Sequence, residues 1–258
     1  SAWSKAMLGW VIPKRPVQGI NYISAVQLNP EVYKIGDGEG GYPVGEYLLI
    51  ENRQAILSDK YLPKGGLVIY HIDDGKLKND KTSQQGWPGQ NGWPQNNKHY
   101  RVAVLQADGD YDLERERNLG DGGDVFRKNG GGVRKLLPSN DPNIGSNIYP
   151  NTDAYQDGNI RQTGLKITNI SNSMSTMSFK CSGSGCTGVT CGEDESLVTV
   201  YIKTDYYPGE TEWSLFVDGN VAMSGGPYEA EAIFDYQMCI SDSSCVEFEI
   251  TDSGNDGM

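Results

Sequence analysis

Short runs rich in β-branched and aromatic residues recur along the first 180 residues, and each is bounded by Gly, Pro, Asn or Asp. This composition is typical of strands, and such runs lie at 46–53, 65–73 and 99–108. Residues 164–171 and 174–181 alternate apolar and polar positions around a short Ser/Asn turn, which predicts a hairpin. Only the opening segment has a helical pattern. We therefore expect a mainly β fold, with an antiparallel β-sandwich-like region, a short N-terminal helix and long loops.

A second β pattern follows a segment that is small, polar and rich in Gly and Cys, "CSGSGCTGVTCGE" at 181–193. Four apolar runs then alternate with turn residues, which predicts a small antiparallel sandwich. The chain begins abruptly at "SAWSKAMLGW", so we expect the sequence to be an internal fragment, and it stops inside a turn, so we expect this module to be incomplete. The predicted domains are 1–180, a linker at 181–193, and an acidic β module at 194–258.

Charge divides the chain in the same place. The formal net charge is −12, yet residues from Glu193 onward hold 15 acidic side chains and one basic one, Lys203. Phosphates would be repelled by this surface, which argues against nucleic acid as a partner. No apolar run approaches the roughly 18 residues of a membrane-spanning helix, so no membrane span is expected.

All five cysteines lie in the last third of the chain. Cysteines clustered beside a Gly/Ser-rich segment favour disulfides and a secreted, extracellular protein. The short spacing of Cys239 and Cys245 between strand-like runs predicts that these two are oxidised together, and the other disulfide candidates are Cys181, Cys186 and Cys191. One glycosylation sequon begins at Asn169.

Seven carboxylates crowd one glycine-rich segment, 108–124. Alternating oxygen ligands next to glycine are what a hard cation such as Ca²⁺ requires, and the predicted structural calcium ligands are Asp108, Asp110, Asp112, Asp121 and Asp124. The segment is not an EF-hand, because Leu113 stands where that loop needs Gly. The alternative is a solvated loop partly neutralised by the three nearby arginines, Arg115, Arg117 and Arg127. Nothing in the pattern singles out two carboxylates as a glycosidase pair.

The two histidines are the next candidates for chemistry. His71 and His99 could each ligate a metal together with Asp73 or Asp74, but no H-E-x-x-H motif is present, and a structural role is favoured. No serine nucleophile motif, P-loop or dinucleotide fingerprint occurs either. The sequence therefore contains no recognisable catalytic site.

Tryptophans offer a possible polysaccharide contact. Trp87 and Trp93 lie in a Pro- and Gly-rich loop, 84–97, and could stack on a sugar or a peptide. The alternative is that they fold back onto the sheet, and this alternative is favoured. A sugar-binding module that uses these two side chains and Trp213 is therefore a further hypothesis.

An ordered series of motifs resembles the immune inhibitor A-like family of secreted zinc metallopeptidases. The series runs over about residues 1–180 and comprises "SAWSKAMLGWV", "GEYLLIENRQ", "LPKGGLVIYHID", "HYRVAVLQADGDYDL", "GDGGDVF" and "TGLKITNIS" with a following "MSF". The resemblance implies that an H-E-x-x-H helix upstream of this segment holds Zn²⁺, so no zinc ligand is carried over onto this chain. It implies proteolysis of a protein or peptide substrate by the parent protein and an inactive segment by itself. It also implies calcium stabilisation through Asp108, Asp112, Asp121 and Asp124.

Residues 194–258 resemble small secreted β modules of diatom and other algal proteins. The matching positions are Tyr207, Pro208, Glu210, Thr211, Trp213, Ser224, Gly225, Gly226, Tyr228, Cys239 and Cys245. In that pattern a cysteine pair follows "DSGNDGM", which would supply a partner for the odd cysteine. The main hypothesis is a fragment of a secreted zinc-metallopeptidase-like protein, and the rival is a non-enzymatic calcium-binding adhesion, matrix or carbohydrate-binding protein.

Overall fold

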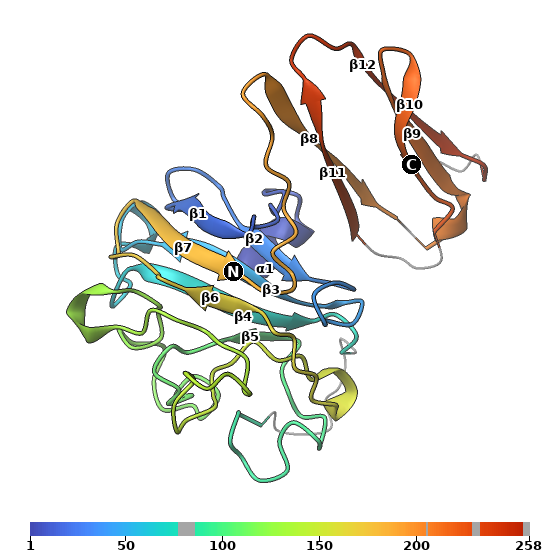
Figure 1. Ribbon diagram of the computed structural model, residues 1–258. Helices are drawn as coiled ribbons and strands as arrows, with labels where there is room; N and C mark the ends of the chain where they lie inside the picture. Colours follow the sequence, from blue (N-terminus) through green and yellow to red (C-terminus); the bar gives the residue numbers. More distant parts are fainter. Residues whose placement is uncertain (77–85, 205, 229–232, 255–258) are drawn as a thin grey trace. The chain divides into compact units, whose positions relative to one another are not determined.

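The computed structural model describes residues 1–76, 86–204, 206–228 and 233–254. It divides into two compact units, Ser1–Gly188 and Val189–Met258. The division falls inside the Gly- and Cys-rich segment, whose residues 181–188 belong to the first unit and not to a separate linker. The fold is mainly β with one short N-terminal α-helix and several antiparallel sheets, which confirms the predicted fold class (Figure 1).

The described residues of the first unit form two antiparallel sheets. One has the strand order β2-β3-β4-β5 and the other β1-β7-β6. The bounds are β1 Gly19–Ser24, β2 Tyr33–Gly36, β3 Glu46–Arg53, β4 Gly66–Asp73, β5 Val102–Val104, β6 Lys166–Thr168 and β7 Thr176–Ser182. The predicted hairpin is confirmed, because β6 pairs antiparallel with β7. The predicted strand at 99–108 is shorter than expected, with regular pairing at Val102–Val104 alone.

The main core lies where the two sheets face each other. Leu48 and Ile50 of β3 alternate with residues of the opposite face, as do Leu67 and Ile69 of β4, and all four are buried. Buried side chains of β1, β2, β6 and β7 complete the cluster: Ile23, Tyr33, Ile35, Ile167, Met177, Phe179 and Cys181. Each fully buried Leu, Ile or Phe contributes roughly 1.5–3 kcal/mol relative to an exposed one.

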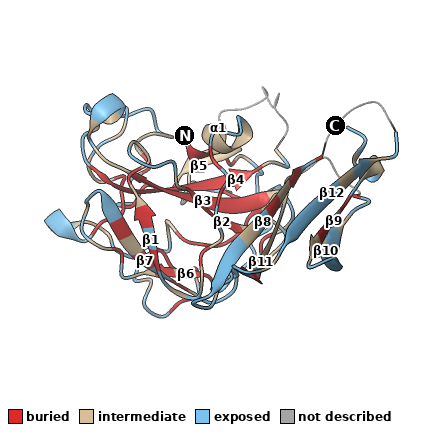
Figure 2. Ribbon diagram, turned by 90° about the horizontal axis from the view of Figure 1, so that it is seen from above, coloured by how far each residue is buried: buried red, intermediate tan, exposed pale blue. Residues whose placement is uncertain are grey.

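The opposite face of the four-stranded sheet is also covered. Helix α1, Ala2–Met7, and neighbouring residues pack on a second buried cluster that includes Tyr47, Leu49 and Tyr70. Both faces of β3 and β4 are therefore buried, and both strands are almost wholly red in Figure 2. The Ser1 Oγ accepts a hydrogen bond from the Ser4 amide and caps the helix. A helix of six residues is not stable in isolation, so its packing on the sheet must hold it.

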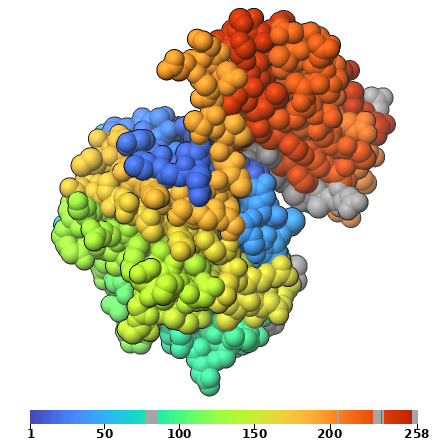
Figure 3. Space-filling model, in the orientation of Figure 1, coloured from blue at the N-terminus to red at the C-terminus, as the bar shows by residue number. Residues whose placement is uncertain are grey.

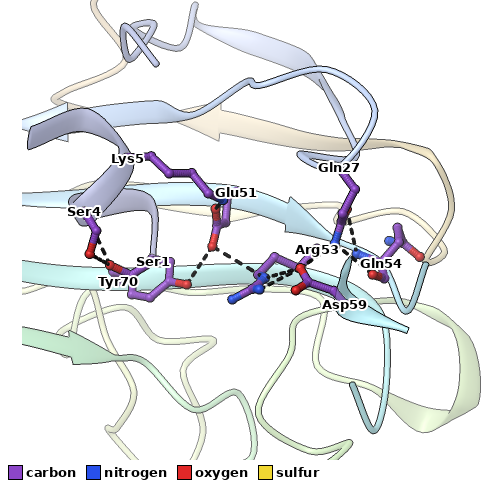
Figure 4. Close-up of polar contacts among 9 residues, drawn as sticks. All are labelled: Ser1, Ser4, Lys5, Gln27, Glu51, Arg53, Gln54, Asp59 and Tyr70. Atoms are coloured by element: carbon purple, nitrogen blue, oxygen red, sulfur yellow. Dashed lines mark hydrogen bonds and ion pairs between the residues drawn. The ribbon is translucent and has the colours of Figure 1, made fainter. Parts of the chain in front are cut away.

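A buried carboxylate joins this helix to the sheet (Figure 4). Glu51 on β3 has no exposed surface, and it accepts hydrogen bonds from the Tyr70 hydroxyl at 2.6 Å and from Lys5 Nζ at 2.7 Å. Burial and the Glu51 charge together raise the pKa of Tyr70. Arg53 extends the network to Asp59 through a 2.6 Å contact. The sheet face under α1 is therefore held by charge pairing as well as by apolar packing.

Long loops connect β5 to β6. In the space-filling view their green and yellow-green segments form one continuous region of the surface of the first unit (Figure 3). Short 3₁₀ turns occur among the loops of both units, at η1 Leu57–Asp59, η2 Asn129–Gly131, η3 Gln156–Gly158 and η4 Pro208–Glu210. The acidic segment 108–124 lies at the start of this region.

The second unit has a two-stranded sheet and a three-stranded sheet, ordered β11-β8 and β10-β9-β12. The bounds are β8 Glu195–Lys203, β9 Thr211–Val217, β10 Asn220–Gly225, β11 Ile233–Ser241 and β12 Val246–Asp252. A single apolar cluster contains Trp213, whose indole N–H donates to the Tyr228 hydroxyl at 2.6 Å. This arrangement is the small antiparallel sandwich that the alternating pattern predicts.

Two disulfides join Cys181 to Cys186 and Cys191 to Cys239. The predicted Cys239–Cys245 pair is wrong. Cys239 stands on β11 next to β8, close to where the chain enters the unit, and its Cα lies 5.3 Å from that of Cys191. Cys245 lies in the turn before β12, where its amide donates to Asp218, and its thiol is free and exposed. Within the described ranges, no helix has the length and apolarity needed to span a membrane.

Candidate functional site

The acidic segment is a loop whose two ends are fixed on the sheet. After β5, the Leu105 amide donates to the Ile69 carbonyl, and the Ala107 amide donates to the Asp124 carbonyl at 3.1 Å. Phe126 then exchanges two backbone hydrogen bonds with Leu67 at the start of β4. The loop therefore closes on itself at residues 107 and 124, beside the core, and this closure places Asp108 next to Asp124.

Three carboxylates converge at this closure. Asp108, Asp121 and Asp124 each offer one oxygen, and the three oxygens lie within 4.8 Å of one another. Asp108 and Asp121 are exposed, whereas Asp124 is buried. We call these three residues the carboxylate triad. In the described part of the chain, none of the three has a lysine or arginine partner within ion-pair distance.

Local hydrogen bonds hold the triad in place. The Asp121 amide donates to Asp124 Oδ2 at 2.6 Å, and the Gly123 amide donates to Asp121 Oδ1 at 2.6 Å. A Cβ on residue 123 would lie 1.9 Å from Asp108 Oδ2, so only glycine allows the Asp108 carboxylate to approach the backbone there. The glycines of the loop therefore serve the close approach of the carboxylates.

The triad carries unbalanced negative charge. Burial raises the pKa of Asp108 and of Asp124, and the neighbouring carboxylates, Asp121 among them, raise both pKa values further. Both effects disfavour the ionised form, and the positive charge of a bound cation would oppose them. Carboxylate oxygens are the preferred ligands of Ca²⁺, which takes six to eight oxygens in all. The three carboxylates thus match the ligand type that Ca²⁺ prefers, and they would supply part of its coordination shell.

Two of the five predicted ligands lie outside the triad. Asp110 is exposed, and Asp112 is engaged by Arg117 Nη1 at 3.4 Å and by Asn118 Nδ2 at 3.3 Å. Sequence spacing suggested an alternating ligand set, but the loop turns after Asp108, and Tyr111 has a positive φ of 54°. The structure therefore brings together Asp108, Asp121 and Asp124.

The alternative interpretation, a loop neutralised by Arg115, Arg117 and Arg127, is met at one position among the described residues. Arg117 pairs with Asp112, while the Arg115 guanidinium lies over the Trp87 ring at 5.6 Å. Arg127 donates to the carbonyls of Gly122 and Val125. None of these contacts involves a triad carboxylate.

The two histidines are buried against carboxylates at the end of β4. His71 Nε2 lies 2.9 Å from Glu46 Oε1, and His99 Nε2 lies 2.6 Å from Asp73 Oδ2. Because β3 and β4 pair Glu46 with Asp73, these groups share one sheet face. The Tyr155 ring packs on both imidazoles, with centroids at 4.0 Å and 5.0 Å.

This arrangement fits a structural role. Glu46 also accepts the backbone amides of Tyr155 and Gln156, so it fastens a distant loop to the sheet. Asp74, the other predicted partner, is engaged instead by Tyr47 and Arg101. Among the described residues, the carboxylate triad is the sole group of three His, Cys, Asp or Glu side chains close enough to share a metal ion.

The tryptophans do not form an exposed platform. Trp93 and Trp213 are buried, which confirms for Trp93 the alternative that it folds back onto the protein. Trp87 is half-buried under Arg115, and part of its predicted loop, residues 84 and 85, lies outside the described residues. The predicted glycosylation residue, Asn169, is exposed just after β6.

No protein-family model, curated protein or solved structure matches this chain.

Proposed function

We propose that this chain is the non-catalytic, β-rich part of a secreted zinc-metallopeptidase-like protein, stabilised by Ca²⁺ at Asp108, Asp121 and Asp124. The observation that carries the proposal is the carboxylate triad at the closure of the loop. A divalent cation there would offset the mutual repulsion of the three carboxylates. It would thereby fix residues 107 and 124 beside the core.

Proteolysis belongs to the parent protein in this proposal. The described residues do not fit a zinc site, because the two buried histidines each face a carboxylate and share no third ligand. The Zn²⁺ ligands and the protein or peptide substrate site would lie on the H-E-x-x-H region that the motif series implies upstream. The present segment is then a scaffold without activity of its own.

An extracellular setting is supported by two features. Disulfides persist in oxidising compartments, and two are present. Extracellular calcium modules bind with dissociation constants of about 10⁻⁴–10⁻³ M, so a partly exposed triad suits that environment.

The rival function is a calcium-binding adhesion or matrix protein in which the protease-like part has no enzymatic partner. Its polysaccharide-binding form is disfavoured, because the indole rings of Trp93 and Trp213 are buried and cannot stack on a sugar. Casein cleavage by the full-length parent protein, lost with 1,10-phenanthroline, supports the peptidase reading. A full-length protein with no H-E-x-x-H motif and no cleavage supports the rival.

The calcium proposal is tested by thermal melting of the 258-residue chain, first in EDTA and then in millimolar Ca²⁺. If the dissociation constant is about 10⁻⁴ M, a Ca²⁺ concentration of about 10 mM is about 100 times higher and stabilises the folded state by roughly 2.7 kcal/mol. We expect a rise in Tm of the first unit by several degrees, with a smaller effect of Mg²⁺ at equal concentration. Identical melting curves in EDTA and Ca²⁺ would rule out the structural calcium site.

A further inference from the structure

A small pocket opens on the first unit beside β5. Its walls include four aromatic rings and one carboxylate, and we call these residues the aromatic pocket: Trp93, Tyr100, Tyr111, Glu114 and Tyr155. The enclosed space is about 10 Å³, which is room for one group of the size of a water molecule, so a ligand can place only a small head group there and must leave its chain at the open mouth. Glu114 belongs to the acidic run of the sequence, but its side chain lines this pocket and not the carboxylate triad.

Glu114 brings a negative charge into the pocket, and no cation of the described residues balances it. Its carboxylate accepts a hydrogen bond from the Gln106 amide, and in the described ranges no lysine or arginine reaches it. Burial raises the pKa of Glu114. The pKa of Tyr100 and that of Tyr111 are raised too, by burial and then by the charge of Glu114, which means that both phenols lie near this carboxylate.

Two further polar groups of the pocket lack partners. Tyr111 is 4% exposed and Trp93 is 7% exposed. In the part of the chain that the structure describes, neither the Tyr111 hydroxyl nor the Trp93 indole N–H has a hydrogen-bond partner. Buried polar atoms are nearly always satisfied, so an orphaned hydroxyl and an orphaned N–H at one pocket call for a polar partner that enters it, such as water or a polar ligand group.

The aromatic walls are held rigidly. Trp93 meets Tyr155 edge-to-face at 4.9 Å and Tyr149 at 5.5 Å, and Tyr155 packs in turn on the two buried imidazoles. His99 also lines the pocket, and its Nε2 is engaged by Asp73. The walls therefore need little reorganisation when a ligand enters.

We propose that the aromatic pocket binds the primary ammonium group of an alkyl chain, such as the side chain of a lysine residue in a peptide. Aromatic faces attract cations, most strongly where water is excluded. A carboxylate such as Glu114 adds a charge-assisted hydrogen bond, and the Tyr111 hydroxyl accepts another of the three ammonium N–H groups. A neutral or anionic head group would leave the Glu114 charge uncompensated or repelled.

The free amine and the peptide lysine differ in one respect that the pocket can read. The Trp93 N–H is a donor in need of an acceptor, and a peptide lysine carries carbonyl oxygens whereas an alkylamine carries none. Stronger binding of a lysine amide than of a simple amine therefore points to a peptide or protein ligand. This inference does not rest on the calcium proposal, since the pocket and the triad use different side chains.

Binding is measured by NMR titration of the 258-residue chain at a fixed, saturating Ca²⁺ concentration. The probes are n-butylammonium, 1-butanol, which has the same number of heavy atoms without the charge, and Nα-acetyl-lysine N-methylamide. We expect saturable shifts of Trp and Tyr ring signals with n-butylammonium and binding at least about tenfold weaker with 1-butanol. Equal affinity for the two, or no saturable binding of n-butylammonium, would overturn the proposal.

A matched pair of variants locates the site. Glu114→Gln keeps the shape and removes the charge, and it should weaken n-butylammonium binding by about tenfold. Glu116→Gln makes the same change at an exposed position two residues away and should leave the affinity unchanged. If Glu114→Gln fails to fold, as circular dichroism would reveal, the comparison of the two probes on the unaltered protein still decides. Retention of full affinity by a folded Glu114→Gln would refute the assignment.

Discussion

Replacing Asp108 by Asn should have opposite effects on stability with and without calcium. The Asn side chain keeps an oxygen that can accept the hydrogen bond from the Asp110 backbone N–H, which Asp108 Oδ1 accepts at 3.1 Å, so the local structure is preserved. It removes one of three charges that lie within 4.8 Å of one another. Without a cation, the variant loses two repulsive pairs. With calcium, it loses one charged ligand.

The size of the effect follows from the separation and the solvent exposure. At 4.8 Å, two unit charges repel by about 0.9 kcal/mol in water and by roughly 3.5 kcal/mol at an effective dielectric constant of 20. Asp108 and Asp121 are exposed, so the aqueous limit is the better guide. In EDTA the variant should therefore be more stable by about 1–2 kcal/mol, which is a rise in Tm of roughly 2–8 °C for a unit of this length.

In calcium the order should reverse. The unaltered chain gains roughly 2.7 kcal/mol at about 100 times its dissociation constant, and the variant gains little. Asp110→Asn is the matched control, because it makes the same charge change in the same loop outside the triad. Scanning calorimetry in EDTA and in Ca²⁺ compares the three proteins. The reasoning is refuted if Asp108→Asn lowers Tm in EDTA, or if Asp110→Asn abolishes the calcium response and Asp108→Asn does not.

The same triad predicts a pH dependence. The pKa values of Asp108 and Asp124 are raised above the ordinary value of 3.8 in the folded state, so the folded protein binds protons more tightly there than the unfolded chain. The stabilisation from these protons is complete below the unfolded pKa and is lost as pH rises through the raised folded pKa. In EDTA, the stability advantage of Asp108→Asn should therefore shrink as the pH falls toward 3.8. An advantage that stays constant between neutral pH and this value would contradict the electrostatic explanation.

Three further predictions test other parts of the structure. Replacing Cys191 and Cys239 together by Ser should destabilise the second unit by about 4 kcal/mol in the chain-entropy model, given their sequence separation of 48. Urea unfolding measures this loss. Non-reducing peptide mapping that recovers Cys239 linked to Cys245 would contradict the pairing. Glu51→Ala should cost about 3–5 kcal/mol in urea unfolding because it leaves buried polar partners unpaired, and a loss below about 1 kcal/mol would show that the network is solvated. Burial would raise the pKa of Asp73, but hydrogen bonds from His99 and Gln156 outweigh it and hold that pKa below 3.8. The stability that comes from the ionised form is therefore present above pH 3.8 and is lost as pH falls through the lower folded pKa. Asp73→Asn should cost about 2 kcal/mol at pH 7, and an equal loss at pH 2 would exclude the charge as the cause.

The strands could be predicted because their signals are local. The β-branched and aromatic composition and the turn residues on either side place the strands at 46–53 and 65–73 almost to the residue, since both faces of β3 and β4 are buried and every position there is apolar or paired. The strand at 99–108 was overestimated because composition does not show where the chain leaves the sheet. It does so after Leu105, whose backbone bond to Ile69 is the last before the loop.

The candidate site could be predicted in part. The density of carboxylates marks the loop, but which of them converge depends on the hydrogen bond between Ala107 and Asp124, a closure across the whole segment. The disulfide partner of Cys239 depends likewise on the register of β8 and β11. Glu46 and Glu51 read as ordinary polar positions of a strand, and only the packing of both sheet faces shows that they are buried.

The bridge between Cys191 and Cys239 also determines how the second unit would respond to mechanical tension. The bridge encloses the residues between two positions separated by 48 in sequence, which would extend to roughly 170 Å if the chain were drawn out. Force applied through the two ends of the chain passes across the sulfur atoms and bypasses β8, β9 and β10. While the disulfide is intact, β8, β9 and β10 carry none of this tension along their own backbone, whereas β12 lies outside the enclosed segment and is pulled directly. Reduction of the disulfide would allow the enclosed segment to extend.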